Sequence, residues 1–356
     1  MLTTPSTSFI GLLTLTLLVP ACGGGGATET SPESTGTEAG TEAGAETEAG
    51  DEAETGDETG DETGTDPDPD PDPEACWTDL SFGEQQVFYQ GFPDGSEGIS
   101  FGADGLLYVT TREPGGGTIW RLDAAANLSE FAKVPYALGL AARPEGGFVV
   151  ASFGINNEPD GAVYAVTAEG IASELTDGID NANFVALVAD GSALISDASD
   201  TRVFHVTPAG ELSVVIEQVP SPNGMAYSPA RDYFYVASTF TPVGQLTRFE
   251  VDDAGLPIEA SAVEILQLGP VTTPDGLAVD ADGMVYVAAT VPGQVWRVRG
   301  DAEAVESGEL VAEGLGSPAS LAFGRGPEFD PCSIYLTQLF GDQIIRVAIG
   351  TPGAAL

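Results

Sequence analysis

A phrase that returns along the chain limits the possible folds more than any other feature of the sequence. Residues 221–228 read Ser-Pro-Asn-Gly-Met-Ala-Tyr-Ser, and residues 273–280 read Thr-Pro-Asp-Gly-Leu-Ala-Val-Asp. After each phrase come a turn and a second apolar run, at 231–238 and 282–288. Repetition of such short units is typical of folds built from stacked or radially arranged repeats.

The unit recurs six times at spacings of 40 to 52 residues. Short β-rich runs separated by Gly, Pro, Asp and Asn turns continue each copy, and helical periodicity is almost absent, which favours an all-β fold. With four strands per copy, the sequence predicts a six-bladed β-propeller. A β-sandwich explains neither the sixfold repeat nor the incomplete last unit. The aligned first-strand positions are Glu97, Leu138, Asn183, Asn223, Asp275 and Ala319.

The last copy lacks its fourth strand, and a matching run at 85–90 precedes the first copy. We expect this N-terminal strand to complete the last blade, which would leave no exposed sheet edge. Cys76 and Cys332 flank this closure. In an oxidising compartment their simplest arrangement is a disulfide, which would close a loop of about 255 residues and stabilise the fold by roughly 5 kcal/mol.

The N-terminus predicts a targeting segment. Residues 9–21 are apolar or small, a run too short to span a bilayer, and they end at Leu-Val-Pro-Ala before Cys22. This ending resembles a bacterial lipobox, which implies a signal peptide over 1–21 and a lipidated Cys22. An ordinary signal peptide with an incidental Cys is the alternative. The lipobox interpretation predicts a cell-envelope lipoprotein on the periplasmic or cell-surface side of a bacterial membrane.

Residues 22–75 predict a disordered acidic tether, and residues 76–356 predict the propeller. Positions 27–74 hold 18 acidic residues and no basic one, in Thr-, Glu-, Ala-, Gly- and Asp-Pro-rich repeats that cannot bury a core. The rest of the chain has 11 basic and 37 acidic residues, a net charge near −26 (11 minus 37). Both parts repel polyanions, so we expect no nucleic-acid partner, and no membrane contact beyond the lipid anchor. We also expect a monomer.

The repeat places polar side chains at one mouth of the propeller channel, because the first strand of each blade lines the channel. Four of the six aligned positions carry side-chain oxygens: Glu97, Asn183, Asn223 and Asp275. Two carboxylates packed together repel, and a divalent cation would offset that charge. Ligands that are all oxygen favour Ca²⁺ first, then Mg²⁺ or Mn²⁺. The alternative is that Asn-Gly and Asp-Gly are only turn formers.

At these residues the chain resembles the SMP-30/gluconolactonase/LRE-like propellers, over about residues 84–350. Glu97-Gly98, Pro-Asn-Gly-Met at 222–225 and Pro-Asp-Gly-Leu at 274–277 match the family's phrases. The resemblance implies metal ligands at Glu97, Asn223 and Asp275, with Asn183 as a ligand or substrate contact. The chain has Asn181 where gluconolactonase-type members have Arg, and this departure argues against a sugar lactone as substrate.

The ends of the second strands are expected to form the wall of the pocket above the ion, because those strands run antiparallel to the first. Substrate contacts are predicted at Asn183, Arg112, Asp197 and Ser238. The ends read Thr111, Ser152, Asp197, Ser238, Ala289 and Gln338, and the loops beyond them add Arg112, Asn156, Asn157 and Asp200. The sole histidine, His205, lies on a third strand away from the axis, so a Ser-His-Asp triad is not expected.

Three functions fit these patterns. The first is a metal-dependent hydrolase of a lactone or related ester, acting on a small molecule, with Asp275 or Glu97 as the catalytic group that takes a proton from water. The second is hydrolysis of a phosphotriester. The third is a non-catalytic ligand- or protein-binding propeller in which the ion is structural.

Overall fold

The structure, a computed structural model of the chain, describes residues 76–77, 80–93, 95–113, 116–155 and 160–355. All of them belong to the second of two compact units, Asp66–Leu356. The predicted signal peptide, Cys22 and the tether over 22–75 lie outside the described residues. Within that described part, no helix has the length and apolar character needed to cross a bilayer.

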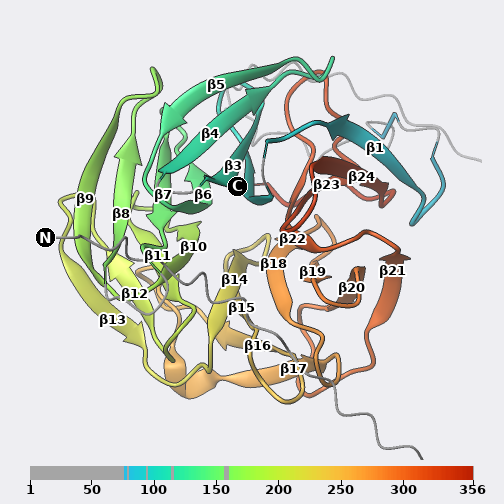
Figure 1. Cartoon of the computed structure of the whole chain (residues 1–356). Coiled ribbons are helices and arrows are strands. Elements are labelled where there is room, and N and C mark those ends of the chain that lie inside the picture. Colours follow the sequence, from blue (N-terminus) through green and yellow to red (C-terminus); the bar gives the residue numbers. More distant parts are fainter. Residues whose placement is uncertain (1–75, 78–79, 94, 114–115, 156–159, 356) are drawn as a thin grey trace, which may run out of the picture. The chain divides into compact units, whose positions relative to one another are not determined.

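Six antiparallel sheets of four strands each form the blades of a propeller (Figure 1). The prediction of an all-β, six-bladed propeller is therefore confirmed. Blades 1 to 3 consist of β2 (Ser96–Phe101), β3 (Leu107–Glu113), β4 (Gly116–Leu122) and β5 (Leu128–Lys133); β6 (Ala137–Ala142), β7 (Phe148–Ser152), β8 (Gly161–Val166) and β9 (Ala172–Ile179); and β10 (Ala182–Leu187), β11 (Ala193–Asp197), β12 (Val203–Val206) and β13 (Leu212–Ile216).

Blades 4 to 6 repeat the arrangement, and blade 4 also carries the 3-10 turn η2 (Glu259–Ser261) before its last strand. They consist of β14 (Pro222–Tyr227), β15 (Tyr233–Ser238), β16 (Gln245–Glu250) and β17 (Val263–Gln267); β18 (Pro274–Val279), β19 (Met284–Ala289), β20 (Gln294–Arg299) and β21 (Glu309–Glu313); and β22 (Pro318–Phe323), β23 (Ser333–Gln338), β24 (Gln343–Ala348) and β1 (Gln85–Gln90).

The N-terminal strand β1 closes the ring by pairing with β24, the last strand of the chain, as predicted. The register runs from Gln85 opposite Val347 to Gln90 opposite Gln343. This pairing gives blade 6 its fourth strand from the other end of the sequence. Residues beyond β24 also return to the ring, where the Ala354 N–H donates to the Val279 carbonyl of blade 5 over 2.9 Å.

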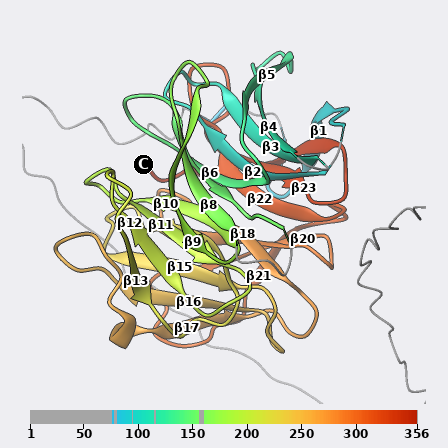
Figure 2. The ribbon, with the colours of Figure 1, turned by 60° about the vertical axis from the view of Figure 1, so that its left-hand side comes forward.

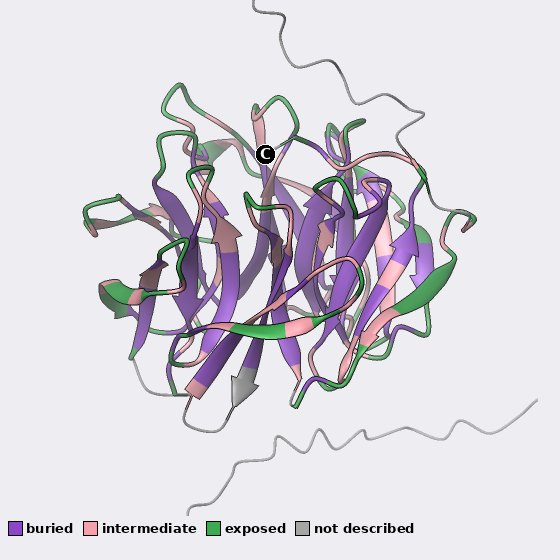
Figure 3. Ribbon diagram, turned by 90° about the horizontal axis from the view of Figure 1, so that it is seen from above, coloured by how far each residue is buried: buried purple, intermediate pink, exposed green. Residues whose placement is uncertain are grey.

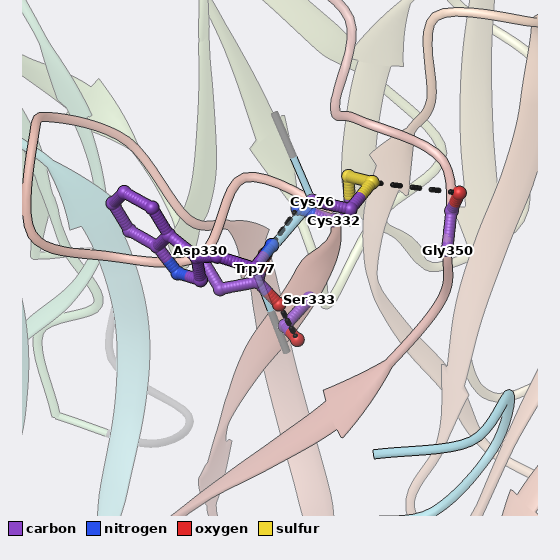
Figure 4. The surroundings of a disulfide bond; sticks show 6 residues. All are labelled: Cys76, Trp77, Asp330, Cys332, Ser333 and Gly350. Carbon is purple, nitrogen blue, oxygen red and sulfur yellow. Dashed lines mark hydrogen bonds between the residues drawn. A yellow bond between two sulfur atoms is a disulfide. The ribbon is translucent and has the colours of Figure 1, made fainter. Parts of the chain in front are cut away.

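The predicted disulfide between Cys76 and Cys332 is confirmed, with the two Cα atoms 5.3 Å apart. Figure 4 shows the bond beside the buried carboxylate of Asp330. That carboxylate accepts hydrogen bonds from the backbone N–H groups of Trp77, at 3.4 Å, and Cys332, at 3.2 Å. The segment before β1 is thus fixed to blade 6 by a covalent bond and by a shared hydrogen-bond acceptor.

The hydrophobic core is divided into six clusters, each between two neighbouring blades. Between blades 1 and 2, for example, Tyr108 and Ile119 pack against Leu140 and Phe148. Figure 2 shows the inner strands at the centre of this packing, and Figure 3 shows buried strands joined by exposed loops. Burial of apolar faces between blades therefore holds the ring together and fixes the inner strands that line the channel.

Each of four blades pairs a tyrosine on its second strand with an arginine on its third. The pairs are Tyr108 with Arg121, Tyr235 with Arg248, Tyr286 with Arg297 and Tyr335 with Arg346. In blade 3 His205 takes the arginine's place opposite Leu194, and its Nε2 lies 2.7 Å from the Ser192 hydroxyl. This position supports a structural role for His205.

Candidate functional site

The site is built on an irregularity that all six inner strands share. Ser96 pairs with Thr111 and Ile99 with Val109, so Glu97 and Gly98 together face a single residue of β3. The same β-bulge interrupts the first strand of every other blade. A bulge re-aims side chains at the rim of a sheet, and here it falls on the aligned polar position of each repeat.

Glycine after that position permits close contact between neighbouring inner strands. A Cβ on Gly98 would collide with the Leu138 carbonyl, and one on Gly224 would collide with the Asp275 carbonyl. Asn223-Gly224 and Asp275-Gly276 lie inside β14 and β18. The turn-former interpretation of these dipeptides is therefore wrong, because the glycines are required by packing between blades and not by a turn.

The four predicted metal ligands lie one residue inside their strands, on the ring of inner strands around the channel. All are buried, with exposed fractions of 7% for Glu97, 6% for Asn183, 5% for Asn223 and 7% for Asp275. The apolar positions of the ring, Leu138 and Ala319, are buried as well. We name the end of the channel at which these six residues lie the channel mouth.

The amide oxygen of Asn223 is buried and has no hydrogen-bond partner among the described residues. A buried acceptor without a donor costs free energy, so such an atom calls for a ligand. The hydroxyl of Thr290 donates to Asp275 Oδ2 over 3.2 Å. Two buried carboxylates and two buried amides, one of which lacks a donor, fit a hard divalent cation.

The backbone before three of the ring positions is strained. Tyr136, Ser221 and Thr273 have φ values of 46°, in the left-handed region that non-glycine residues seldom adopt. Each lies two residues before a ring position, and the hydroxyl of Ser221 is bonded to the Ala198 carbonyl at 2.8 Å. Strain of this kind persists only where the surrounding structure imposes it, and it is common at functional sites.

The ends of the second strands form less of a pocket wall than the sequence suggested. The Ser152 hydroxyl donates to the Pro135 carbonyl over 2.6 Å, and the Gln338 amide donates to the Leu315 carbonyl over 2.7 Å. Ser238, a predicted substrate contact, is fully buried, and its hydroxyl has no partner among the described residues. Ser152 and Gln338 thus hold the loops that surround the mouth, whereas the Ser238 hydroxyl remains available for a hydrogen bond.

Asp197, another predicted substrate contact, is fully buried and serves as an acceptor for neighbouring loops. Its carboxylate receives hydrogen bonds from the backbone N–H groups of Asp180, Asn181 and Ser199 and from the Ser199 hydroxyl. Burial nevertheless raises the pKa of Asp197 above its ordinary value. These four donors point to a positioning role for Asp197.

A second group of carboxylates surrounds Asp197. Oxygens of Asp180, Asp197 and Asp200 lie within 4.8 Å of one another, a spacing at which a metal ion can be held. Arg202 already pairs with two of them, with a short bond to Asp200 and a 3.9 Å contact to Asp180. Its guanidinium offsets part of the charge, so we retain the ring of inner strands as the candidate metal centre.

Three of the predicted loop residues lie wholly or partly outside what the structure describes. The backbone of Arg112 pairs with Gly117 in blade 1, but its side chain lies outside the described part. Asn156 and Asn157 lie outside it entirely. Asn181 is 4% exposed, and its amide bonds the Phe153 carbonyl at 2.9 Å and the Ser199 hydroxyl at 2.7 Å.

Comparison with known proteins agrees with this geometry. The sequence model of the SMP-30/Gluconolactonase/LRE-like region matches residues 95–330. The chain belongs to this family. The match covers the inner strands that carry Glu97, Asn183, Asn223 and Asp275, and it extends from blade 1 into blade 6.

Two curated relatives have sequence similarity to parts of the chain. The pentonolactonase XacC of Haloferax volcanii is 29% identical over 206 residues, 53% of this chain and 67% of that protein. The gluconolactonase of Zymomonas mobilis is 26% identical over 131 residues, 35% of each protein. The second match thus spans about a third of the relative's length.

Solved structures of family-like propellers share the fold. A gluconolactonase from Xanthomonas campestris gives a TM-score of 0.60 at 17% identity, over 76% of this chain and 89% of that one. Regucalcin from Agrobacterium tumefaciens, a calcium-binding protein, gives 0.61 at 18% identity, over 77% and 96%. At these identities the likeness concerns the fold alone.

Thr239 and Thr290 are site residues that sequence reasoning missed. Each follows the last residue of a second strand; Thr290 contacts the Asp275 carboxylate, and the Thr239 hydroxyl donates to the Pro274 carbonyl over 2.7 Å. Both are buried, with exposed fractions of 7% for Thr239 and 6% for Thr290. The sequence contained a pattern that could have predicted them, because a threonine follows the last residue of the second strand in two successive repeats.

Proposed function

We propose that this protein is a divalent-metal-dependent hydrolase of a lactone or a related ester, and that it acts on a small molecule at the channel mouth. The observation that carries the proposal is the ring of buried oxygen donors, in which the Asn223 amide oxygen has no donor among the described residues. Membership of a family that includes lactonases supports the reaction class. The relatives' names alone would be a weaker argument.

Glu97, Asn183, Asn223 and Asp275 would hold the ion, with Ca²⁺ favoured over Mg²⁺ and Mn²⁺ by the all-oxygen donor set. A divalent ion bound there polarises a carbonyl group and lowers the pKa of a bound water. The buried positions keep bulk water away from the donors and strengthen their electrostatic effect. Asn223 then gains the partner for its amide oxygen that the described residues do not supply.

Asp275 or Glu97 would act as the base in ester cleavage. The carboxylate takes a proton from a water molecule as the water oxygen bonds to the carbonyl carbon. The ring C–O bond then breaks, the leaving oxygen is protonated, and the product is a hydroxy acid. Thr290 donates to Asp275 Oδ2 and so fixes the orientation of that carboxylate. The net negative charge of the chain favours release of the anionic product.

A panel of lactones, carboxylic esters and phosphotriesters, assayed with the full-length protein, tests this proposal. We expect lactone hydrolysis that a chelator abolishes and added Ca²⁺ restores, and loss of that activity in Asp275→Asn. Val305→Ala, an exposed change outside the ring, is the matched control and should retain activity. Preferred cleavage of phosphotriesters would reassign the substrate class. An inactive protein that binds Ca²⁺ would identify a binding propeller with a structural ion.

We also propose that residues 1–21 are removed and that Cys22 carries a lipid. The support is the apolar run before Cys22 and the acidic, core-free composition of 22–75, which suits a tether. This arrangement would display the hydrolase at a membrane surface within the cell envelope.

A further inference from the structure

Three exposed apolar residues occupy the same position in three successive blades. Phe240, Val291 and Phe340 each stand two residues after the last residue of a second strand, in blades 4, 5 and 6. Their exposed fractions are 75%, 60% and 84%. Exposed apolar side chains of this extent, gathered on one surface, mark a binding surface more often than isolated exposed residues do. We name these three residues the apolar arc.

Hydrogen bonds attach the apolar arc to the channel mouth. The Val291 N–H donates to the Thr273 hydroxyl over 3.1 Å, and Thr273 lies two residues before Asp275. The Phe340 N–H donates to the Ser317 hydroxyl over 2.9 Å, and Ser317 lies two residues before Ala319. Val291 is thus fixed beside the strand that carries Asp275, and Phe340 beside the strand that carries the apolar ring residue Ala319.

The connection continues through the residues that precede the arc. Thr290, directly before Val291, bonds the Asp275 carboxylate, and Thr239, directly before Phe240, bonds the Pro274 carbonyl. Gly95, two residues before Glu97, packs so closely on the Leu339 carbonyl that a Cβ there would collide with it. A molecule that places its reacting carbonyl at the ring therefore has the arc beside it.

The arc covers only half of the rim. Thr111, Ser152 and Asp197 hold the same place in the pairing register of blades 1, 2 and 3. By that register the equivalent residues are Glu113, Gly154 and Ser199, none of which is a large apolar residue. On that half Asp200 and Arg202 form an ion pair. Among the described residues, the rim thus offers the apolar arc on blades 4 to 6 and, on blades 1 to 3, charged groups with one exposed apolar side chain, Ile155.

Two of the polar groups that could bind a polyhydroxylated substrate are already bonded within the protein. Asn181 uses its amide on Phe153 and Ser199, and Asp197 accepts four hydrogen bonds from the surrounding loops. Neither is available to bind sugar hydroxyl groups without breaking those bonds. Removal of apolar surface from water is instead the interaction that the rim of blades 4 to 6 can supply.

We infer that the apolar arc binds the hydrocarbon substituent of the substrate, so that the preferred substrate is an alkyl- or acyl-substituted lactone rather than a sugar lactone. This inference rests on the proposed lactone hydrolysis. The carbonyl of the lactone ring reaches the ring of oxygen donors while its chain lies across Phe240, Val291 and Phe340. Selectivity comes from the length of the chain, because each methylene group covered by the arc adds favourable burial.

The test measures kcat/KM of the full-length protein for γ-butyrolactone, its alkyl-substituted homologues up to γ-decalactone, and glucono-1,5-lactone. We expect kcat/KM to rise about two- to fourfold per methylene over the first few carbons and to be lowest for the sugar lactone. In Phe240→Ala/Phe340→Ala the ratio of γ-decalactone to γ-butyrolactone should fall at least about tenfold. The control Ile171→Ala/Val305→Ala, exposed on loops between third and fourth strands, should keep the wild-type ratio.

Binding of alkyl-substituted γ-lactams, which resist hydrolysis, separates this inference from the proposed function. If no lactone is cleaved but lactam affinity rises with chain length and falls in the double variant, the arc binds the hydrocarbon chain as inferred, and the proposed hydrolysis is wrong. If lactones are cleaved without regard to chain length, the inference fails alone. The inference is also wrong if the wild-type protein is a dimer, the double variant is a monomer, and the ratio of kcat/KM for γ-decalactone to that for γ-butyrolactone is the same in both. The arc would then be a contact between two copies of the chain.

Discussion

The hydroxyl of Thr337 donates a hydrogen bond to the backbone carbonyl of Glu97 over 2.5 Å. The same oxygen accepts the N–H of Ser320 at the bulge of its own blade over 3.0 Å. One side chain on blade 6 therefore fixes the bulge of that blade and a candidate metal ligand of blade 1. Thr110 makes the equivalent bonds, accepting from the Gly98 N–H and donating to the Leu138 carbonyl of blade 2.

Replacing Thr337 with Val should destabilise the protein while preserving the shape of the side chain. The change leaves the buried N–H of Ser320 and the carbonyl of Glu97 without this partner, at a cost of about 1–3 kcal/mol. The measurement is the free energy of unfolding by urea. Thr337→Ser keeps the hydroxyl and should lose much less. A loss in Thr337→Ser as large as that in Thr337→Val would show that the methyl group, which Ser lacks and Val keeps, contributes as much as the hydrogen bonds. An unchanged stability of Thr337→Val would contradict the role of the hydrogen bonds.

Removing a charged ring residue should weaken calcium binding more than removing a neutral one. A charged contact contributes about 1.5–3 kcal/mol and a neutral one about 1 kcal/mol, so we expect a rise in Kd of roughly 10- to 100-fold for Asp275→Ala and about fivefold for Asn183→Ala. Isothermal titration calorimetry with Ca²⁺ measures both.

Leu138→Ala is the matched control for calcium binding, because Leu138 occupies the same ring position in an apolar blade. It should leave the Kd for Ca²⁺ nearly unchanged while loosening the packing. Wild-type affinity in Asp275→Ala would rule out the ring as the metal centre.

Stability should decline as the pH rises through the folded-state pKa of Asp280. Burial raises that pKa above the ordinary value near 3.9, so the folded form binds its proton more tightly than the unfolded form does. The contribution is fully present below about pH 3.9 and is lost as the pH rises past the higher, folded-state pKa. Unfolding free energies measured from pH 3 to 8 should fall less steeply in Asp280→Asn. If the unfolding free energy of Asp280→Asn falls with pH as steeply as that of the wild type, Asp280 does not cause the decline.

Loss of the disulfide should lower stability without changing the fold. Cys76→Ser opens the long covalent loop, and the chain-entropy model predicts a loss of about 5 kcal/mol. Thermal unfolding with and without reductant measures the effect, and circular dichroism should report unchanged strand content. In the variant, reductant should have no further influence. A wild-type protein whose melting temperature ignores reductant would show that the bond contributes little to stability.

Cys22→Ser should release the protein from membranes into the soluble fraction of its native host. The expected cause is loss of the lipid attached to Cys22, and fractionation with immunoblotting measures the release. Mass spectrometry of the wild-type N-terminus provides the second readout. A mature chain that starts at another residue and is already soluble would favour the ordinary signal peptide.

The blades could be predicted from the sequence because the residue patterns that define them lie within each repeat. Each repeat carries its own turns and alternating strands, and the closing strand at 85–90 could be recognised by its likeness to strands that precede other copies. The pairing of Cys76 with Cys332 was the simplest arrangement of the two cysteines in the folded part. These features depend on patterns that a short stretch of chain already contains.

The bulges and the side-chain contacts at the mouth were not predictable in the same way. Asn223-Gly224 has the composition of a turn, yet it lies inside β14 because contact with blade 5 requires glycine there. Asp197 was expected to contact substrate, but the loop around Ser199 places donors on its carboxylate. Both outcomes depend on segments that meet only after the ring has formed.

The position of the disulfide has a mechanical consequence. A force that pulls on the chain before Cys76 passes through the sulfur bridge to Cys332 and reaches β23. The hydrogen bonds between β1 and β24 bear none of this load, although β1 begins only nine residues after Cys76. With the bridge reduced, the same pull would peel β1 from β24 one bond at a time. Oxidation of Cys76 and Cys332 thus keeps the ring closed under tension, whereas their reduction lets β1 separate from β24 sequentially.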